Sequence, residues 1–494
     1  SANGRMYYQI NSWFRLLDLM PFSKRIKPVW RQSLGVKSVE SPEDKASKKL
    51  AFRYRVLAFC KAAVMSWRLP ARMKKLDSEF QETRRYFNEQ LRPNMNNQEL
   101  LDLYRSIKDK VLKNWDLTLS NDTYAFAYSG LLRWAASDSD LELNEFLSRV
   151  GGVESMKPVI ELAKLVNQVV EEDRLIELKK LSNDQEAADY LKSKSDPLAE
   201  AINRFIGEYG DRSLAELKLE SPTWRTSPHL LIQEILQIAD SKTRLNRLNS
   251  QAKAHQTAGQ EIKGSSVLRR PLIKYFRKRA LIGIKNREIS RLNRSRIFGM
   301  VRAIFMQISQ QLYEQKALEE PEDIFYLTID EVERLVDTPD SNINELIERR
   351  RQEYLDYAGL PAYSHLVFAG QVFDKTAAHQ SQTDVVSEQV GLSGSPCSNG
   401  EVEGEVLIVS DPRQAKSVEG KILVTKMTDP GWVFLMVAAK GIIAEKGSLL
   451  SHTAIISREL GIPAVVGVDK ATSLLKTGDM IRMNGGNGKI DRLK

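Results

Sequence analysis

Residues 445–468 read EKGSLLSHTAIISRELGIPAVVGV, and this stretch decides the fold of the C-terminal part of the chain. A turn leads from a short apolar run into one helix, predicted over residues 453–460, which ends at Gly461 with Pro463 just beyond. Glycine directly after the last helical residue and proline shortly after it are typical of a helix end. The pattern therefore places His452 at the first turn of a helix, where backbone N–H groups remain free and the helix dipole is positive.

Short β-rich runs surround this helix and are separated by turns. They are predicted at residues 404–409, 421–426, 441–444, 462–468 and 479–483, with a tight connection at Asn484–Gly488. A polar stretch with Gly391, Gly394 and Pro396 precedes them and shows neither helical nor strand periodicity. We therefore expect a small α/β domain at 400–494 after a flexible linker or hinge at 386–399.

Residues 1–385 carry helical periodicity almost throughout. Apolar side chains recur at helical spacing over residues 99–117, 159–178, 230–238 and 296–312, with charged residues between them. Proline and glycine are sparse in this part, as long helices require. The fold expected from the sequence is multidomain, with a large, mainly α-helical domain followed by a small α/β domain.

The composition of the 494 residues is that of an ordinary globular protein, with 42% hydrophobic and 28% charged side chains. Apolar runs are too short for a membrane span, so no membrane is expected as a partner. The two cysteines, Cys60 and Cys397, cannot supply a disulfide framework. With no signal-peptide pattern, a reducing cytoplasmic setting is the expectation, and no histidine or cysteine spacing predicts a metal site.

The net charge of +9 comes from 73 basic and 64 acidic residues. Much of the excess lies between Lys263 and Arg302, where Glu288 is the only acid. Because the basic residues are confined to one segment, they indicate a single site or one helix face and not an extended nucleic-acid-binding surface. Because no zinc-finger, bZIP or RRM signature accompanies it, nucleic-acid binding is kept only as a minor alternative.

His452 has two interpretations on residues alone. A histidine at a helix start often caps or packs, which is the bland interpretation. The other is chemical, because histidine is a capable nucleophile toward phosphorus and the helix N-terminus would stabilise the phosphoryl group attached to it.

The string around His452 resembles the swivelling phosphohistidine domain of PEP-utilising enzymes, a family that includes PEP synthase, pyruvate phosphate dikinase and rifampicin phosphotransferase. The resemblance rests on GSLLSHTAIISR at 447–458 and ELGIPAVVG at 459–467, with GEVEG at 400–404, TDPGW at 428–432, and GD at 478–479 followed by NG at 484–485. It covers residues 400–494, and TDPGW points to the rifampicin phosphotransferase branch. It implies that His452 carries a phosphoryl group on a loop that includes Gly447, Ser451, Thr453 and Arg458.

The resemblance extends upstream to the branch's helical acceptor domain, through GRMYY at 4–8, YGDR at 209–212 and EPEDIFYLT at 320–328. It implies that two basic residues flanking a glutamate hold the phosphoryl group, a pattern that Arg287 and Arg291 match. Residues four apart share one helix face, so both guanidiniums could grip the same phosphoryl oxygens. The alternatives are a solvated basic face for the arginines, and a plain helix C-terminus capped by Gly210 for residues 209–212.

No ATP-grasp phosphate loop or Walker sequence is found in the chain. The resemblance therefore implies that ATP and Mg²⁺ are bound by an ATP-grasp domain or subunit outside it, and that the chain alone is inactive. The PEP/pyruvate barrel of PEP synthase is also missing, which favours a hydroxylated small molecule as acceptor. Because Ser448 and Leu450 depart from the commonest family pattern, a non-catalytic binding or regulatory module that keeps the swivelling fold remains the alternative.

Overall fold

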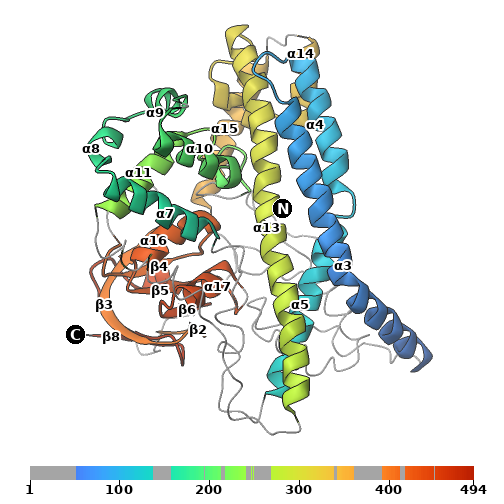
Figure 1. The fold of residues 1–494 in the computed structure, drawn as a ribbon, viewed down its shortest axis with the longest axis vertical. Coiled ribbons are helices and arrows are strands. Elements are labelled where there is room, and N and C mark those ends of the chain that lie inside the picture. The colour runs from blue at the N-terminus through green and yellow to red at the C-terminus, as the bar shows by residue number, and fades with distance from the viewer. Residues whose placement is uncertain are drawn as a thin grey trace. The chain divides into compact units, whose positions relative to one another are not determined.

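The computed structural model describes residues 52–136, 157–193, 195–212, 217–240, 246, 249, 269–338, 342–360, 392–411, 418–449 and 451–493. These residues group into two compact units. The larger unit contains the described residues up to 308 together with those from 392 onwards, and the smaller contains those from 309 to 360 (Figure 1). The upstream GRMYY stretch at 4–8 lies outside the described residues.

The first part of the larger unit is helical, as its periodicity predicts. Its described helices are α3 (Phe52–Gln90), α4 (Asn97–Leu112), α5 (Asp116–Ala135), α7 (Lys157–Glu171), α8 (Leu175–Leu178), α9 (Asp184–Leu191), α10 (Pro197–Tyr209), α11 (Pro228–Ala239) and most of α13 (Arg270–Glu314). Two of the predicted helical segments, 99–117 and 159–178, are each divided between two helices. The breaks fall where Asn114 and Asp173 adopt left-handed backbone conformations, with φ of 63° and 52°. Asparagine and aspartate tolerate that conformation better than most residues, which is why the chain turns there.

Polar side chains join α13 to the helices beside it. The Asn293 amide donates to the Asp77 carboxylate of α3 at 2.8 Å, and the buried Asn121 amide of α5 donates to the Gly283 carbonyl at 2.9 Å. Gly283 is required at that crossing, because a Cβ there would lie 2.9 Å from Ala125. These contacts fix the rotation of α13 about its axis. They thereby fix the direction in which the helix face with Arg287 and Arg291 points.

The second part of the larger unit is an α/β domain with an eight-stranded sheet in the order β1-β8-β7-β3-β4-β5-β6-β2. Strands β3 to β6 are parallel, whereas β7 and β8 continue the sheet from β3 in antiparallel fashion. The strands are β1 (Leu392–Ser393), β2 (Ser395–Ser398), β3 (Glu401–Ile408), β4 (Ile422–Thr425), β5 (Gly441–Ala444), β6 (Ala464–Val466), β7 (Met480–Asn484) and β8 (Lys489–Arg492). The short helices are η5 (Pro430–Trp432), α16 (Val433–Ala438), α17 (His452–Glu459) and α18 (Ala471–Leu474).

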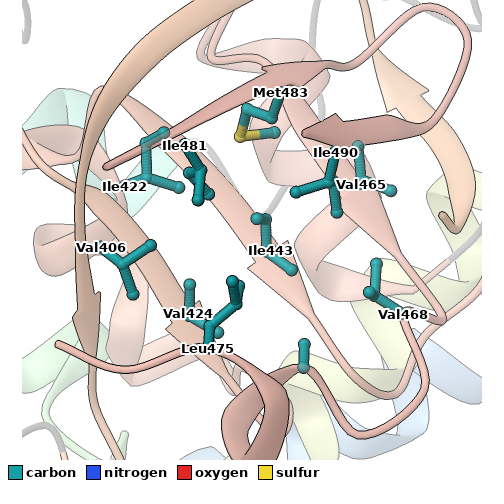
Figure 2. Packing of buried hydrophobic residues seen from close by; sticks show 11 residues of the cluster. Val406, Ile422, Val424, Ile443, Val465, Val468, Leu475, Ile481, Met483 and Ile490 are labelled. Carbon is teal, nitrogen blue, oxygen red and sulfur yellow. The ribbon is translucent and has the colours of Figure 1, made fainter. Parts of the chain in front are cut away.

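Branched aliphatic side chains fill the core of this domain (Figure 2). Val424, Ile443 and Val465 come from neighbouring parallel strands, and each is fully buried. Ile481 and Ile490 reach the same cluster from the antiparallel strands. The five predicted strands are all present, because each was read from a short apolar run bounded by turn residues.

The predicted linker at 386–399 needs correction at its C-terminal end. Residues 392–398 form β1 and β2, which pair with β8 and β6 and so belong to the sheet. The Asn484–Gly488 turn packs directly against this segment, since a Cβ on Gly485 would overlap the Ser398 carbonyl oxygen. These strands have only two and four residues, so the sequence shows no strand periodicity there. Residues 386–391 of the predicted linker lie outside the described residues.

The smaller unit contains η2 (Pro321–Tyr326), α14 (Ile329–Asp337) and α15 (Ile343–Gly359), which follow the end of α13. Thr328 caps α14 in a capping box with Glu331, at the end of the EPEDIFYLT stretch. Arg350 of α15 binds both oxygens of the same carboxylate, at 2.6 and 2.9 Å. None of the described helices in either unit is long and apolar enough to cross a membrane.

Candidate functional site

His452 begins helix α17 and is enclosed by protein. The preceding Ser451 is the N-cap, and its hydroxyl accepts a hydrogen bond from the Ala454 N–H at 3.3 Å. The His452 side chain is 2% exposed, and neither ring nitrogen has a hydrogen-bond partner among the described residues. Both nitrogens of a buried imidazole are normally hydrogen-bonded. The unpaired nitrogens of His452 therefore either destabilise the folded chain or are available to a ligand.

Two arginines of the helical part act on this imidazole. Burial lowers the pKa of His452 well below its ordinary value, and the positive charges of Arg291 and Arg212 lower it further. The ring is therefore neutral at pH 7, with a lone pair free on one nitrogen. A neutral imidazole under the influence of two arginine charges suits a nucleophile whose product is anionic, because the phosphorylated ring would be attracted to charges that disfavour protonation of the free ring.

Hydrogen bonds of Arg458 and Thr453 hold the loop before His452 and the start of α17 in place. The Arg458 guanidinium is buried and donates to the Cys397 carbonyl of β2 at 2.8 Å and to the Leu449 carbonyl of the loop. Thr453 and Thr428 share a buried hydroxyl–hydroxyl hydrogen bond of 2.8 Å. Arg458 thus fastens the loop to the sheet edge, and Thr428 brings the TDPGW segment beside the His452 helix.

Gly447 adopts a backbone conformation that L-residues rarely take, with φ of 145°. A Cβ there would also lie 3.0 Å from the Ser451 hydroxyl and 3.1 Å from Val466. We therefore expect Gly447→Ala to destabilise the α/β domain by about 1–3 kcal/mol, measured as a lower urea midpoint of unfolding. Gly461→Ala is the matched control, since its φ of 60° is also left-handed but nothing lies within 4 Å of its Cβ. Equal losses for the two variants would contradict the steric part of this argument.

The two arginines predicted to act together have different surroundings. Arg287 pairs with Asp122 of α5 at 3.2 Å and lies over the Phe126 ring at 5.8 Å. The buried Nε of Arg291 has no hydrogen-bond partner among the described residues, and this arginine is the one whose charge reaches His452. The i and i+4 spacing places both on one face of α13, but of the two only the charge of Arg291 lowers the pKa of His452.

Two half-buried carboxylates, Asp429 and Asp122, interact with the arginines of α13 and are not among the site residues expected from the sequence. Burial raises the pKa of Asp429, and Arg291, Arg294 and Lys218 oppose that rise. Burial also raises the pKa of Asp122, and Arg287, Arg294 and Arg291 oppose it in the same way. Asp429 was noted only as a letter of the TDPGW motif. Asp122 carries no local signal, because its role depends on the packing of α5 against α13.

The YGDR stretch agrees with its plain structural interpretation. Helix α10 ends at Tyr209 with Gly210 as its C-cap, as the plain structural interpretation expects. Asp211 then binds Arg225 through both carboxylate oxygens, at 2.6 and 3.1 Å, and this pair anchors the chain just before Arg212. Arg212 is 5% exposed and is one of the two charges that act on His452.

The depressed pKa of His452 has a consequence for stability. Below about pH 6.5 the unfolded chain binds a proton at this ring while the folded chain does not, so acid favours unfolding. We expect stability from this group to be fully present above pH 6.5 and to fall by up to about 1.4 kcal/mol per pH unit below it. Urea unfolding at pH 7.5, 6.5 and 5.5 tests this, and His452→Gln should remove that part of the slope. An unchanged slope in the variant would show that the ring titrates normally.

Two family models match parts of this chain. The mobile domain of PEP-utilising enzymes matches residues 417–488, and the rifampicin phosphotransferase fourth domain matches residues 119–288. The first match contains His452, Asp429 and Arg458, and the second contains Arg212 and Arg287. The first match thus contains the His452 loop, and the second contains Arg212 but ends before Arg291.

Three curated relatives are rifampicin phosphotransferases. That of Bacillus subtilis is 27% identical over 357 residues, which is 68% of this chain and 38% of the relative. Those of Bacillus cereus and Streptomyces sviceus are 29% identical over 308 residues and 30% identical over 351 residues. They are matched over 60% and 68% of this chain, and over 34% and 38% of their own length. The chain thus spans between a third and two fifths of these relatives. It is related to the rifampicin phosphotransferases and carries the mobile domain of PEP-utilising enzymes.

Proposed function

We propose that this chain is the acceptor-binding and phosphohistidine part of an ATP-dependent, dikinase-type phosphotransferase. His452 would take a phosphoryl group that originates from ATP and pass it to a hydroxyl of a small molecule, with AMP and phosphate as co-products. The observation that carries the proposal is the buried imidazole of His452, which has no hydrogen-bond partner among the described residues and whose pKa is lowered by burial and by the charges of Arg291 and Arg212.

The chain's own residues fit both halves of such a reaction. The neutral ring nitrogen attacks phosphorus, and the phosphoryl oxygens that arrive with it meet the N-terminal turn of α17 and the Arg291 guanidinium. Transfer of a phosphoryl group needs charge neutralisation more than covalent help, which arginines supply. Arg458, Thr453 and Gly447 would position the ring, and Arg287 would act through Asp122 and the shared face of α13.

ATP and Mg²⁺ would be bound by an ATP-grasp domain or subunit that acts as the partner of this chain. The curated relatives support this division, because each is more than twice as long as the part that the chain matches. The ATP-grasp partner would be needed for the first half-reaction, in which His452 is charged. The second half-reaction, transfer to the acceptor, would need only the residues described above.

The test is transfer of label from ATP carrying ³²P on the β-phosphate, with the matching ATP-grasp domain supplied. The expected product is an acid-labile, base-stable phosphate on the peptide that contains His452, identified by mass spectrometry. Absence of label in the presence of a folded, ATP-hydrolysing partner would reject the proposal. It would favour the other candidate, a binding or regulatory module in which the swivelling fold is kept without turnover.

A further inference from the structure

Asp429 carries a half-buried carboxylate to which the proposed function gives no role. It directly precedes η5, where the Trp432 N–H donates to the Asp429 carbonyl at 2.8 Å and closes a turn. Among the residues that the structure describes, none forms a hydrogen bond or an ion pair with the Asp429 carboxylate. Its oxygens are therefore available to accept a proton from a ligand.

A buried hydrogen bond places Asp429 beside the loop of His452. The Thr428 and Thr453 hydroxyls are 2.8 Å apart, and both side chains are buried. Asp429 follows the first of these threonines, and His452 precedes the second. The charge of Arg291 acts on both the carboxylate and the imidazole, so both groups lie within reach of one guanidinium. The carboxylate is therefore at the same end of α17 as the histidine.

Two other carboxylates beside these arginines are engaged or enclosed. Asp122 pairs with Arg287 at 3.2 Å. Glu288 has one oxygen without a partner among the described residues, but its side chain is only 4% exposed. Solvent, and with it an acceptor, reaches the half-buried Asp429 more readily than the enclosed Glu288.

The electrostatic surroundings of Asp429 suit a base. Burial raises the pKa of Asp429, which strengthens the carboxylate as a proton acceptor. Arg291, Arg294 and Lys218 oppose that rise and favour the ionised form, which is the form that accepts a proton. A hydroxyl that attacks phosphorus must lose its proton, and an aspartate accepts that proton in protein kinases.

We infer that Asp429 is the general base of the transfer, accepting the proton of the hydroxyl or water that attacks the phosphoryl group on His452. This inference rests on the proposed function and adds a catalytic group to it. The attacking oxygen forms the new P–O bond as the P–N bond to His452 breaks, and its proton passes to the Asp429 carboxylate. The ring nitrogen that has lost phosphorus takes up one proton from solvent, and Asp429 releases one to solvent. Both groups thus return to their starting states.

The experiment starts from the full protein after its ATP-grasp partner has charged His452 with β-labelled ATP and the nucleotide has been removed. It measures release of labelled phosphate to water at pH 8, where the P–N bond is stable without a catalyst. Asp429→Asn keeps the size of the side chain but cannot take up the proton, so it should slow the release about 100-fold. Asp429→Glu should restore part of the rate. Asp479→Asn is the matched control, because Asp479 is another half-buried aspartate of the α/β domain and accepts the Lys476 N–H at 2.9 Å.

A second measurement separates a base from a residue that only packs or holds the domain. Asp429→Ala removes the carboxylate and leaves space for formate, which is a small free carboxylate. Added formate should raise the rate of this variant in a saturable manner, whereas chloride at the same ionic strength should not. A free carboxylate replaces a base in this way, but it does not replace a packing contact.

The outcomes separate this inference from the proposed function. Failure to charge His452 rejects the proposed function itself. With His452 charged, equal release from Asp429→Asn and the unchanged chain overturns the inference, as does a loss that neither Asp429→Glu nor formate restores. A loss found in Glu288→Gln and not in Asp429→Asn also overturns it, because the base would then lie on α13.

Discussion

A His452→Ala chain is expected to acquire no acid-labile phosphate from β-labelled ATP under conditions in which the unchanged chain is labelled. Alanine has no nucleophilic atom in its side chain, and the other histidine among the described residues, His229, already pairs with Asp184. Labelling of the variant should therefore fall below the detection limit and should not merely be reduced. Labelling is measured on the denatured protein at alkaline pH, where phosphohistidine survives.

His229→Ala is the matched control for that experiment. His229 also lies in the first turn of a helix, α11, but its Nδ1 is 2.5 Å from the Asp184 carboxylate, so it already has a partner. Its removal should leave labelling of His452 unchanged. If the label persisted in His452→Ala and disappeared in His229→Ala, His452 would not be the phosphoryl carrier. That result would reject the proposed function.

An Arg291→Met chain is expected to transfer phosphate to and from His452 about 100- to 1,000-fold more slowly than the unchanged chain. This is the loss typical when one donor that stabilises developing negative charge is removed from an enclosed site. Methionine keeps much of the length of the side chain, so the packing of α13 should change little. The rate constant for charging, measured by rapid quench with saturating ATP, reports the effect.

Arg287→Met, the comparison variant, removes a guanidinium one turn earlier on the same face. Arg287 contacts Asp122 and Phe126, and its charge is not among those that act on the His452 ring. We expect a smaller loss of rate, accompanied by a small loss of stability, because the half-exposed Asp122 loses the guanidinium with which it pairs at 3.2 Å. The reverse order, with Arg287 more important for transfer than Arg291, would contradict the site described here.

Much of the α/β domain could be predicted from the sequence, for a local reason. Its parallel strands are short apolar runs bounded by turns, and its helix carries its own end signals at Gly461 and Pro463. The helix was predicted to begin at Thr453 and begins one residue earlier, at His452. Such features depend on neighbouring residues only, so they are visible without knowledge of the fold.

The features that could not be predicted all depend on distant residues. Arg287 and Arg291 look equivalent in sequence, and the difference between them arises because Asp122 of α5 lies opposite only one of them at ion-pair distance. Asp429 becomes part of the site because Thr428 bonds to Thr453. Strands β1 and β2 form because partners from the end of the chain are available to them.

The seven residues from 392 to 398 occupy both edges of the sheet at once, with β1 on β8 and β2 on β6. Unpaired sheet edges are sites at which proteins pair with other chains and aggregate, so one short segment protects the domain at both of its vulnerable borders. Expression of the α/β domain by itself therefore depends on where it is cut. A domain that starts at residue 400 would lack both β1 and β2, so β8 and β6 would each present an unpaired edge. A domain that starts at Leu392 keeps both of these strands paired.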